Sequence, residues 1–263
     1  MKIALVSLDQ KWEDKKGNQD QCRLISKRIS EKFPDLDLII YPEMTLTGFS
    51  VTNKTISEFE NNSESINFFK ELSATTQISH LFGLAIKTAD KQHYNRCCYI
   101  NKNGKMLAQY DKMHTFSFAG ENELYSRGNK PEIVQVDGAK IGLAICFDLR
   151  FSPLYTYYRK QCNLMVNIAN WPDARRSHWL NLLQSRAIEN QAFTVGVNRT
   201  GLDGNGLSYE QSSVIYDPLG EIVTPIYSEK ESAIYDINLK YVDEIRSKLP
   251  FADDLRTELY SNF

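Results

Sequence analysis

The segment Ile141-Gly-Leu-Ala-Ile-Cys146-Phe-Asp-Leu-Arg150 places a cysteine at the end of a nearly continuous apolar run. Such a run is typical of a buried strand, and we expect a sharp turn into a helix after it, with Pro153 near the helix start. Ligands of open α/β sheets gather at the carboxyl ends of strands. The segment therefore predicts an α/β fold in which the turn exposes the Cys146 thiol and directs backbone N–H groups at a developing oxyanion. For this segment alone, a buried structural cysteine is the alternative, because free cysteine is among the most buried residue types.

Strands and helices alternate on both sides of this segment. Short apolar runs predict strands at 1–8, 36–41, 81–86, 164–168 and 194–198, and apolar residues at helical spacing predict helices near 22–33, 66–74 and 179–187. Asn103-Gly104 and Asp137-Gly138 predict tight hairpins, and further strands surround Asp217-Pro-Leu-Gly220. The pattern predicts an α/β protein with mixed sheets and helices on their outer faces. Because no internal repeat or linker interrupts it, we expect one domain over residues 1–263.

The composition is that of an ordinary globular protein. The 263 residues carry a net charge of −2, with 42% apolar and 24% charged residues, so we expect no nucleic-acid partner. No stretch approaches the ~20 apolar residues of a membrane-spanning helix, and the first residues do not resemble a signal peptide. We therefore expect a cytoplasmic protein without a membrane partner. The five cysteines form no Cys-x-x-Cys pair, which argues against a zinc site and against a redox pair.

Two further ionisable residues directly follow predicted strands. In Leu38-Ile-Ile-Tyr-Pro-Glu43-Met-Thr-Leu-Thr-Gly48, a carboxylate comes after an apolar run and a proline. Glutamate is seldom buried unless it is paired, so this placement indicates a function, with a solvated loop residue as the alternative. In Gln109-Tyr-Asp-Lys112-Met-His114, a lysine follows a strand in the same way. Beside a thiol it would lower the thiol pKa and stabilise negative charge on a bound carbonyl oxygen, and its alternative is a surface lysine.

His114 also suggests a cysteine–histidine pair of the papain type. We prefer Glu43, Lys112 and Cys146 as the catalytic set, because a histidine base would leave the glutamate and the lysine without roles. Glu43 would take the proton from Cys146, and the thiolate would attack an amide carbonyl. Lys112 and the backbone N–H of Phe147 would hold the oxyanion. Ammonia would leave behind a thioester, and water deprotonated by Glu43 would release the acid.

With these three residues in this order, the sequence resembles the nitrilase, or carbon–nitrogen hydrolase, superfamily. Over nearly the whole chain it is similar to the bacterial omega-amidase branch, in Ala169-Asn-Trp-Pro172, Arg175, His178-Trp179, Leu182-Leu183, Arg186-Ala-Ile-Glu-Asn-Gln191, Val197-Asn-Arg-Thr-Gly201, Asp203-Gly-Asn-Gly206, Ser213 and Asp217-Pro-Leu-Gly-Glu221. The resemblance implies a four-layer αββα sandwich of two mixed sheets with helices on the outer faces. It also implies a homodimer formed through the helical layers.

The resemblance further implies a second active-site glutamate between the lysine and the cysteine. The spacing from His114 favours Glu121 for this role, with Glu123 as the alternative. Phe147 stands where many relatives have tyrosine. This difference removes a hydroxyl group but keeps the backbone N–H.

Omega-amidases hydrolyse the terminal amide of 2-oxoglutaramate and 2-oxosuccinamate, and the resemblance implies that no metal or other cofactor takes part. The substrate carboxylate requires a cation, ideally a bidentate arginine. Arg150, Arg175 and Arg176 lie near predicted strand ends and are the candidates. Trp171 is expected either to wall the pocket or to be a core aromatic residue. The alternatives are an amidase or carbamoylase that acts on another small amide, and a non-catalytic member that uses the fold for binding.

Overall fold

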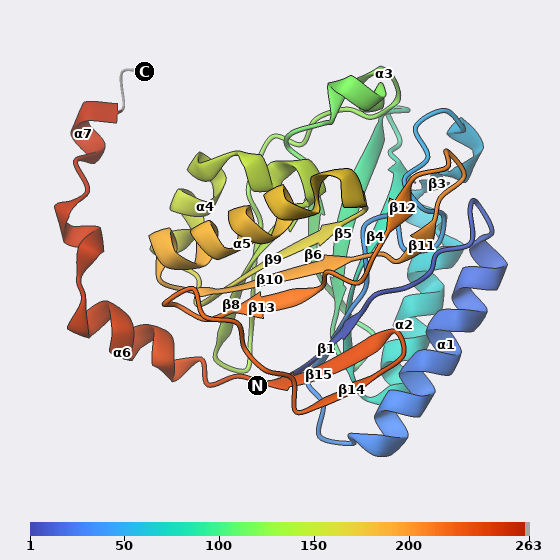
Figure 1. Cartoon of the computed structure of the whole chain (residues 1–263). Helices are drawn as coiled ribbons and strands as arrows, with labels where there is room; N and C mark the ends of the chain where they lie inside the picture. Colours follow the sequence, from blue (N-terminus) through green and yellow to red (C-terminus); the bar gives the residue numbers. More distant parts are fainter. Residues whose placement is uncertain (261–263) are drawn as a thin grey trace.

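Two β-sheets form the centre of the computed structural model, which describes residues 1–260 of the chain (Figure 1). The first sheet runs in the order β14 (Tyr227–Glu229), β15 (Ser232–Asp236), β1 (Lys2–Val6), β2 (Leu38–Ile40), β4 (Ser79–Lys87), β5 (His93–Ile100) and β6 (Met106–Asp111), and β3 (Glu58–Phe59) pairs with β4. The second runs in the order β13 (Val214–Tyr216), β10 (Phe193–Asn198), β9 (Leu164–Ala169), β8 (Ala139–Ile145) and β7 (Ile133–Val136). Both sheets combine parallel and antiparallel pairs.

Helices cover the outer face of each sheet. Helices α1 (Lys15–Lys32) and α2 (Glu64–Thr76) lie on the first sheet, and α4 (Ser152–Arg159) and α5 (Arg176–Asn190) lie on the second (Figure 1). Strand β1 shows how the layers form, because its side chains alternate between two cores. Ile3 and Leu5 belong to the core that includes the second sheet, whereas Ala4 and Val6 pack with residues of α1 and α2. The predicted αββα sandwich is confirmed.

Local sequence signals explain where two of the helices begin and where two of the hairpins turn. The Asp14 carboxylate accepts a hydrogen bond from the Gly17 N–H, so α1 begins at Lys15, earlier than its apolar periodicity predicts. Ser63 caps α2 by accepting from the Ile66 N–H at 3.0 Å. The predicted hairpins are confirmed, and Gly104 and Gly138 adopt φ values of +75° and +83° in their turns.

Several short elements were not predicted. They are α3 (Glu121–Leu124), the hairpin of β11 (Gly201–Leu202) and β12 (Ser208–Tyr209), α6 (Lys240–Lys248) and α7 (Thr257–Tyr260). Within residues 1–260, no helix has both the length and the apolar character needed to cross a membrane.

Candidate active site

Polar side chains from both sheets meet at one end of the sandwich. Glu43 follows β2 and Lys112 follows β6 in the first sheet, whereas Cys146 follows β8 and Asn170 follows β9 in the second. The two sheets contact each other there, because the backbone N–H of Asn170 donates to Glu43 Oε2 at 2.9 Å. The shared sandwich end therefore brings together the three residues that the sequence singles out.

Lys112 lies between two buried carboxylates. Its Nζ is 3.0 Å from Glu43 Oε1 and 2.9 Å from Glu121 Oε2, and all three side chains are at most 1% exposed. Asn95, on β5, donates from Nδ2 to Glu43 Oε1 at 2.6 Å and to Glu121 Oε1 at 2.9 Å. One ammonium and one amide thus hold both carboxylates. Glu121, and not the exposed Glu123, is the glutamate at the lysine.

The Glu43 backbone is held as firmly as its side chain. Its carbonyl oxygen accepts from Asn170 Nδ2 at 2.7 Å and from Gln10 Nε2 at 2.9 Å. Burial raises the pKa of the Glu43 carboxyl, the nearby Lys112 ammonium opposes this, and Glu121 adds to the increase. A carboxylate with a raised pKa accepts protons more readily than an exposed glutamate does.

Cys146 occupies a strained turn at the end of β8. Its φ is +44°, in the left-handed region, which costs a residue with a side chain about 1–2 kcal/mol. It opens the 3₁₀ helix Cys146–Arg150, which leads into α4 with Pro153 in its first turn, as expected. All five cysteines lie in the described residues, and Cys146 alone among them is not fully buried. Its Sγ lies 3.9 Å from the carbonyl oxygen of Asn170.

The pKa of the Cys146 thiol differs from the expectation. Lys112 lowers this pKa, as predicted, but burial and the charge of Glu43 outweigh it and raise the thiol pKa well above its ordinary value. The sequence-based expectation of a net decrease was wrong, because it included the lysine and not the low-dielectric surroundings. The resting thiol is therefore protonated at neutral pH, and its use as a nucleophile requires a base.

A cavity of about 300 Å³ opens beside Cys146. Five aromatic residues line it, among them Phe116, Phe147 and Trp171. Trp171 serves both functions considered above, because it lines the cavity and also packs against Trp179 with ring centroids 5.5 Å apart. The remaining lining residues are Phe49, Val51, Thr52, Lys112, Ala119, Arg150, Asn170, Pro172, Arg175, Asp203, Asn205, Leu207 and Tyr209.

The structure separates the three candidate arginines. Arg150 and Arg175 line the cavity, and Arg176 does not. The Arg150 guanidinium lies 4.9 Å from the Trp171 ring centroid, and that of Arg175 lies 5.6 Å from the Phe116 ring centroid. Among residues 1–260, neither guanidinium has a carboxylate within ion-pair distance. Two cations in the cavity therefore lack a protein counterion.

Sequence reasoning missed several residues at this site. Asn170 follows the apolar strand β9 just as Glu43 follows β2, so the same signal could have identified it. Asn95 lies inside a strand and carries no such signal. Asp203 and Tyr209 come from the unpredicted β11–β12 hairpin, where the Tyr209 hydroxyl donates to Asp203 Oδ2 at 2.9 Å. This bond satisfies a carboxylate at the cavity wall.

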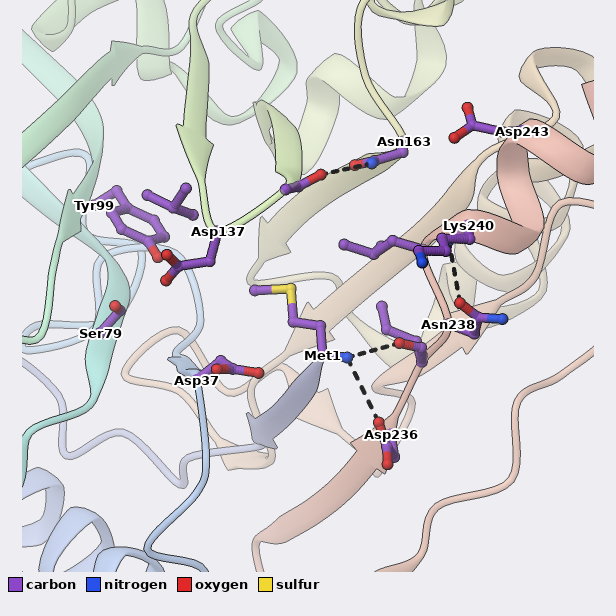
Figure 2. A pocket seen from close by; sticks show the side chains of 14 residues that line it. Met1, Asp37, Ser79, Tyr99, Asp137, Asn163, Asp236, Asn238, Lys240 and Asp243 are labelled. Atoms are coloured by element: carbon purple, nitrogen blue, oxygen red, sulfur yellow. Dashed lines mark hydrogen bonds and ion pairs between the residues drawn. The ribbon is translucent and has the colours of Figure 1, made fainter.

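A larger cavity, of about 740 Å³, lies at the other end of the strands (Figure 2). Two of its lining residues precede strands that the site residues follow: Asp37 precedes β2, and Asn163 precedes β9. Figure 2 shows the N-terminal amino group of Met1 at this cavity, 3.5 Å from Asp236 Oδ1. No cysteine lines it. The smaller cavity is the candidate active site because the Cys146 thiol lines it.

Known proteins are similar to this chain in sequence and in fold. Residues 2–247 match the family model described as carbon-nitrogen hydrolase. The omega-amidase YafV of Yersinia enterocolitica is 32% identical over 97% of this chain and 96% of its own length. The 2-oxoglutaramate amidase of Bacillus subtilis is 28% identical over 88% of this chain and 90% of its own length. A crystal structure of a CN-hydrolase superfamily protein from Xanthomonas campestris, with an arsenic adduct in its active site, superposes with a TM-score of 0.88 and 29% identity over 97% of both chains.

Proposed function

This chain belongs to the carbon–nitrogen hydrolase family and is an amide-hydrolysing enzyme, and we propose that it hydrolyses the terminal amide of small 2-oxoacid amides. The substrates that we propose are 2-oxoglutaramate and 2-oxosuccinamate, and the products are the corresponding 2-oxo diacids and ammonia. Two relatives, an omega-amidase and a 2-oxoglutaramate amidase, support this choice.

The observation that carries the proposal is a pair of guanidinium groups beside the thiol that have no counterion among residues 1–260. Arg150 and Arg175 line the same cavity as Cys146. A substrate carboxylate would supply the missing charge through charge-assisted hydrogen bonds, which arginine forms in bidentate geometry. The volume of about 300 Å³ suits a small substrate.

In the proposed mechanism, Glu43 removes the thiol proton as Cys146 attacks the amide carbon. The carbonyl oxygen becomes an oxyanion, which the Lys112 ammonium and the Phe147 N–H stabilise. Glu43 then passes the proton to the departing nitrogen, so that the carbon–nitrogen bond breaks and ammonia leaves a thioester on Cys146. The raised pKa of Glu43 favours acceptance of the proton, and the raised pKa of the thiol keeps that proton on Cys146 until the attack begins.

The second half of the reaction uses the same groups. Water gives a proton to Glu43 and attacks the thioester carbon, and the returning proton restores the thiol as the carboxylic acid leaves. Lys112 keeps its charge throughout, because the two carboxylates raise its pKa and outweigh the effect of burial. Glu121 holds the ammonium in place through both steps.

Ammonia release from 2-oxoglutaramate and 2-oxosuccinamate tests the proposal. We expect turnover by the wild-type chain and none by Cys146→Ala, with circular dichroism as the check that the variant is folded. Glu43→Gln should lose at least about 10²-fold in kcat, because the general base is gone. Turnover by Cys146→Ala would contradict the mechanism. Hydrolysis of another amide or a carbamoyl compound instead would contradict the proposed substrate class and retain the mechanism.

The arginines provide a matched test of substrate recognition. Arg150→Gln and Arg175→Gln each remove a cavity guanidinium, whereas Arg176→Gln removes the adjacent one, which does not line the cavity. We expect KM for 2-oxoglutaramate to rise by about 10-fold to 100-fold in at least one cavity variant, as for a lost charged hydrogen bond. KM should be unchanged in Arg176→Gln. Equal KM values in all three variants would show that neither cavity arginine binds the carboxylate.

A further inference from the structure

His114 does not line the cavity that opens beside Cys146. Its Nδ1 lies 2.7 Å from Asp148 Oδ1, and its backbone N–H donates to the same oxygen at 2.9 Å. His114 is two residues beyond Lys112, and Asp148 is two residues beyond Cys146. The bond therefore joins the segment that carries the lysine to the turn that carries the thiol.

Asp148 is fully buried and accepts from both of these segments. Its Oδ2 accepts from the Ile145 N–H at 3.0 Å, at the end of β8, and from the Tyr110 hydroxyl at 2.8 Å, on β6. A carboxylate oxygen accepts hydrogen bonds, so the bond between His114 Nδ1 and Asp148 Oδ1 has the imidazole as its donor. One carboxylate thus fixes the residue just before the strained Cys146 and the segment just after Lys112.

The imidazole of His114 also supports the turn by packing. It stacks on Phe151, directly after the Cys146–Arg150 helix, with ring centroids 4.0 Å apart and planes 13° apart. Phe151 in turn contacts Phe147 edge-on at 5.3 Å. The N–H of Phe147 is the proposed oxyanion donor. His114 therefore supports Phe147 indirectly, through the ring of Phe151.

We propose that the His114–Asp148 pair is a clamp that fixes Cys146 and the Phe147 N–H relative to Lys112, and that His114 is a positioning residue. The inference rests on the proposed use of Cys146 as the nucleophile. The strained turn at Cys146 requires such external support, because a left-handed backbone persists only where its surroundings impose it. The histidine is a positioning residue and not the base, since it does not line the cavity in which the thiol lies.

Two substitutions of His114 separate positioning from general stability. In His114→Asn, the side-chain Nδ2 takes the place of the imidazole Nδ1 and can donate to Asp148. In His114→Gln, the amide lies one bond farther from the backbone and cannot do so in the same geometry. Both variants keep the backbone N–H bond to Asp148 and both lose the ring that stacks on Phe151. A comparison of the two variants therefore isolates the effect of the side-chain hydrogen bond to Asp148.

We expect His114→Gln to lower kcat by about 10-fold to 100-fold, the scale on which small misplacements of reacting groups act, with KM little changed. His114→Asn should restore most of the lost kcat. Thermal unfolding curves of the wild type and the two variants identify a temperature at which all three are folded, and kcat is compared there. Wild-type kcat in His114→Gln, absence of rescue in His114→Asn, or an effect on KM alone would overturn the clamp.

Alkylation of Cys146 by iodoacetamide gives a readout that requires no substrate. The other four cysteines are at most 1% exposed, so peptide mass spectrometry can follow the reactive thiol. We expect slower alkylation in His114→Gln and near-normal alkylation in His114→Asn, because Glu43 must be aligned to deprotonate the thiol. Equal rates in all three proteins, or faster alkylation in His114→Gln, would overturn the clamp. If the wild type hydrolyses no amide, the proposed function fails and these rates still test the clamp.

Discussion

At the scale of single residues, the charge balance at Lys112 determines what the site can do. One ammonium faces two buried carboxylates, Glu43 and Glu121, and Asn95 donates to both. The lysine therefore remains charged, and the excess negative charge acts on the remaining titratable groups. It raises the pKa of both Glu43 and Cys146, in addition to the larger effect of burial. The site is thus arranged for proton transfer from thiol to carboxylate during the attack.

Glu121→Gln should shift the pH profile in a defined direction. Glu43 works as a base only when deprotonated, so kcat/KM falls as the pH drops through its pKa. The negative charge of Glu121 raises that pKa, and its removal should move the acid limb of the profile to lower pH and reduce kcat. Glu123→Gln is the matched control, because Glu123 is exposed on the same short helix. An acid limb at the same pH in both variants would contradict the coupling.

At the scale of elements, the close approach of β4 to the segment after β2 sets the position of Glu43. Gly83, inside β4, accepts from the Thr45 N–H at 2.8 Å through its carbonyl oxygen. A Cβ at Gly83 would lie 2.5 Å from the Met44 backbone nitrogen and 2.9 Å from Glu43 Cα. Backbone atoms cannot rotate away as a side chain can, so only glycine permits this spacing.

Gly83→Ala should therefore reduce both activity and stability. Overpacking of this kind costs about 1–3 kcal/mol in the free energy of unfolding, measured by urea denaturation. Because the clash displaces Glu43, kcat should also fall at a temperature where the variant is fully folded. Gly196→Ala is the control: its Cβ would meet the Leu183 side chain at 2.3 Å, inside the sandwich, and should affect stability alone. Unchanged kcat in folded Gly83→Ala would show that the backbone relaxes without moving the base.

At the scale of the whole molecule, the segment that follows α6, residues 251–260 and here called the C-terminal arm, stands apart from the sandwich. Helix α6 is anchored by Arg246, whose guanidinium donates to the carbonyl oxygens of Cys162, Asn190 and Gln191. Beyond α6 the chain runs away from the sheets toward α7 (Figure 1). Phe251 and Leu259 on this arm are 57% and 50% exposed. Apolar side chains on an extended arm are suited to contact a second copy of the chain.

We propose that the chain forms a homodimer to which this arm contributes. Light scattering should give a dimer for the full chain, and deletion of residues 251–263 should weaken the dimer while leaving Arg246 and its contacts in place. The deletion should leave the unfolding of the sandwich cooperative. A full chain that is monomeric at micromolar concentration would contradict the dimer, and a dimer of unchanged affinity after deletion would show that the arm is not part of the interface.

The sequence predicts the architecture well because its signals are local. The apolar runs before Glu43 and Cys146 correspond to β2 and β8, and Asn103-Gly104 and Asp137-Gly138 correspond to hairpins. The short β11–β12 hairpin was missed, because two-residue strands leave no periodic pattern. It nevertheless supplies Asp203 and Tyr209 to the cavity.

By itself, the sequence determined the layered α/β fold and the strand ends that carry Glu43, Lys112 and Cys146, because each signal is contained in a few adjacent residues. Only the tertiary structure decided that Glu121 and not Glu123 meets the lysine, that Arg150 and Arg175 and not Arg176 line the cavity, and that His114 pairs with Asp148. It also decided the direction of the Cys146 pKa shift. These properties depend on burial and on pairs far apart in the chain, such as Glu43 and Asn170 at a separation of 127 residues. The burial of a group and its distance from residues remote in sequence depend on the whole fold, so no local sequence pattern predicts them.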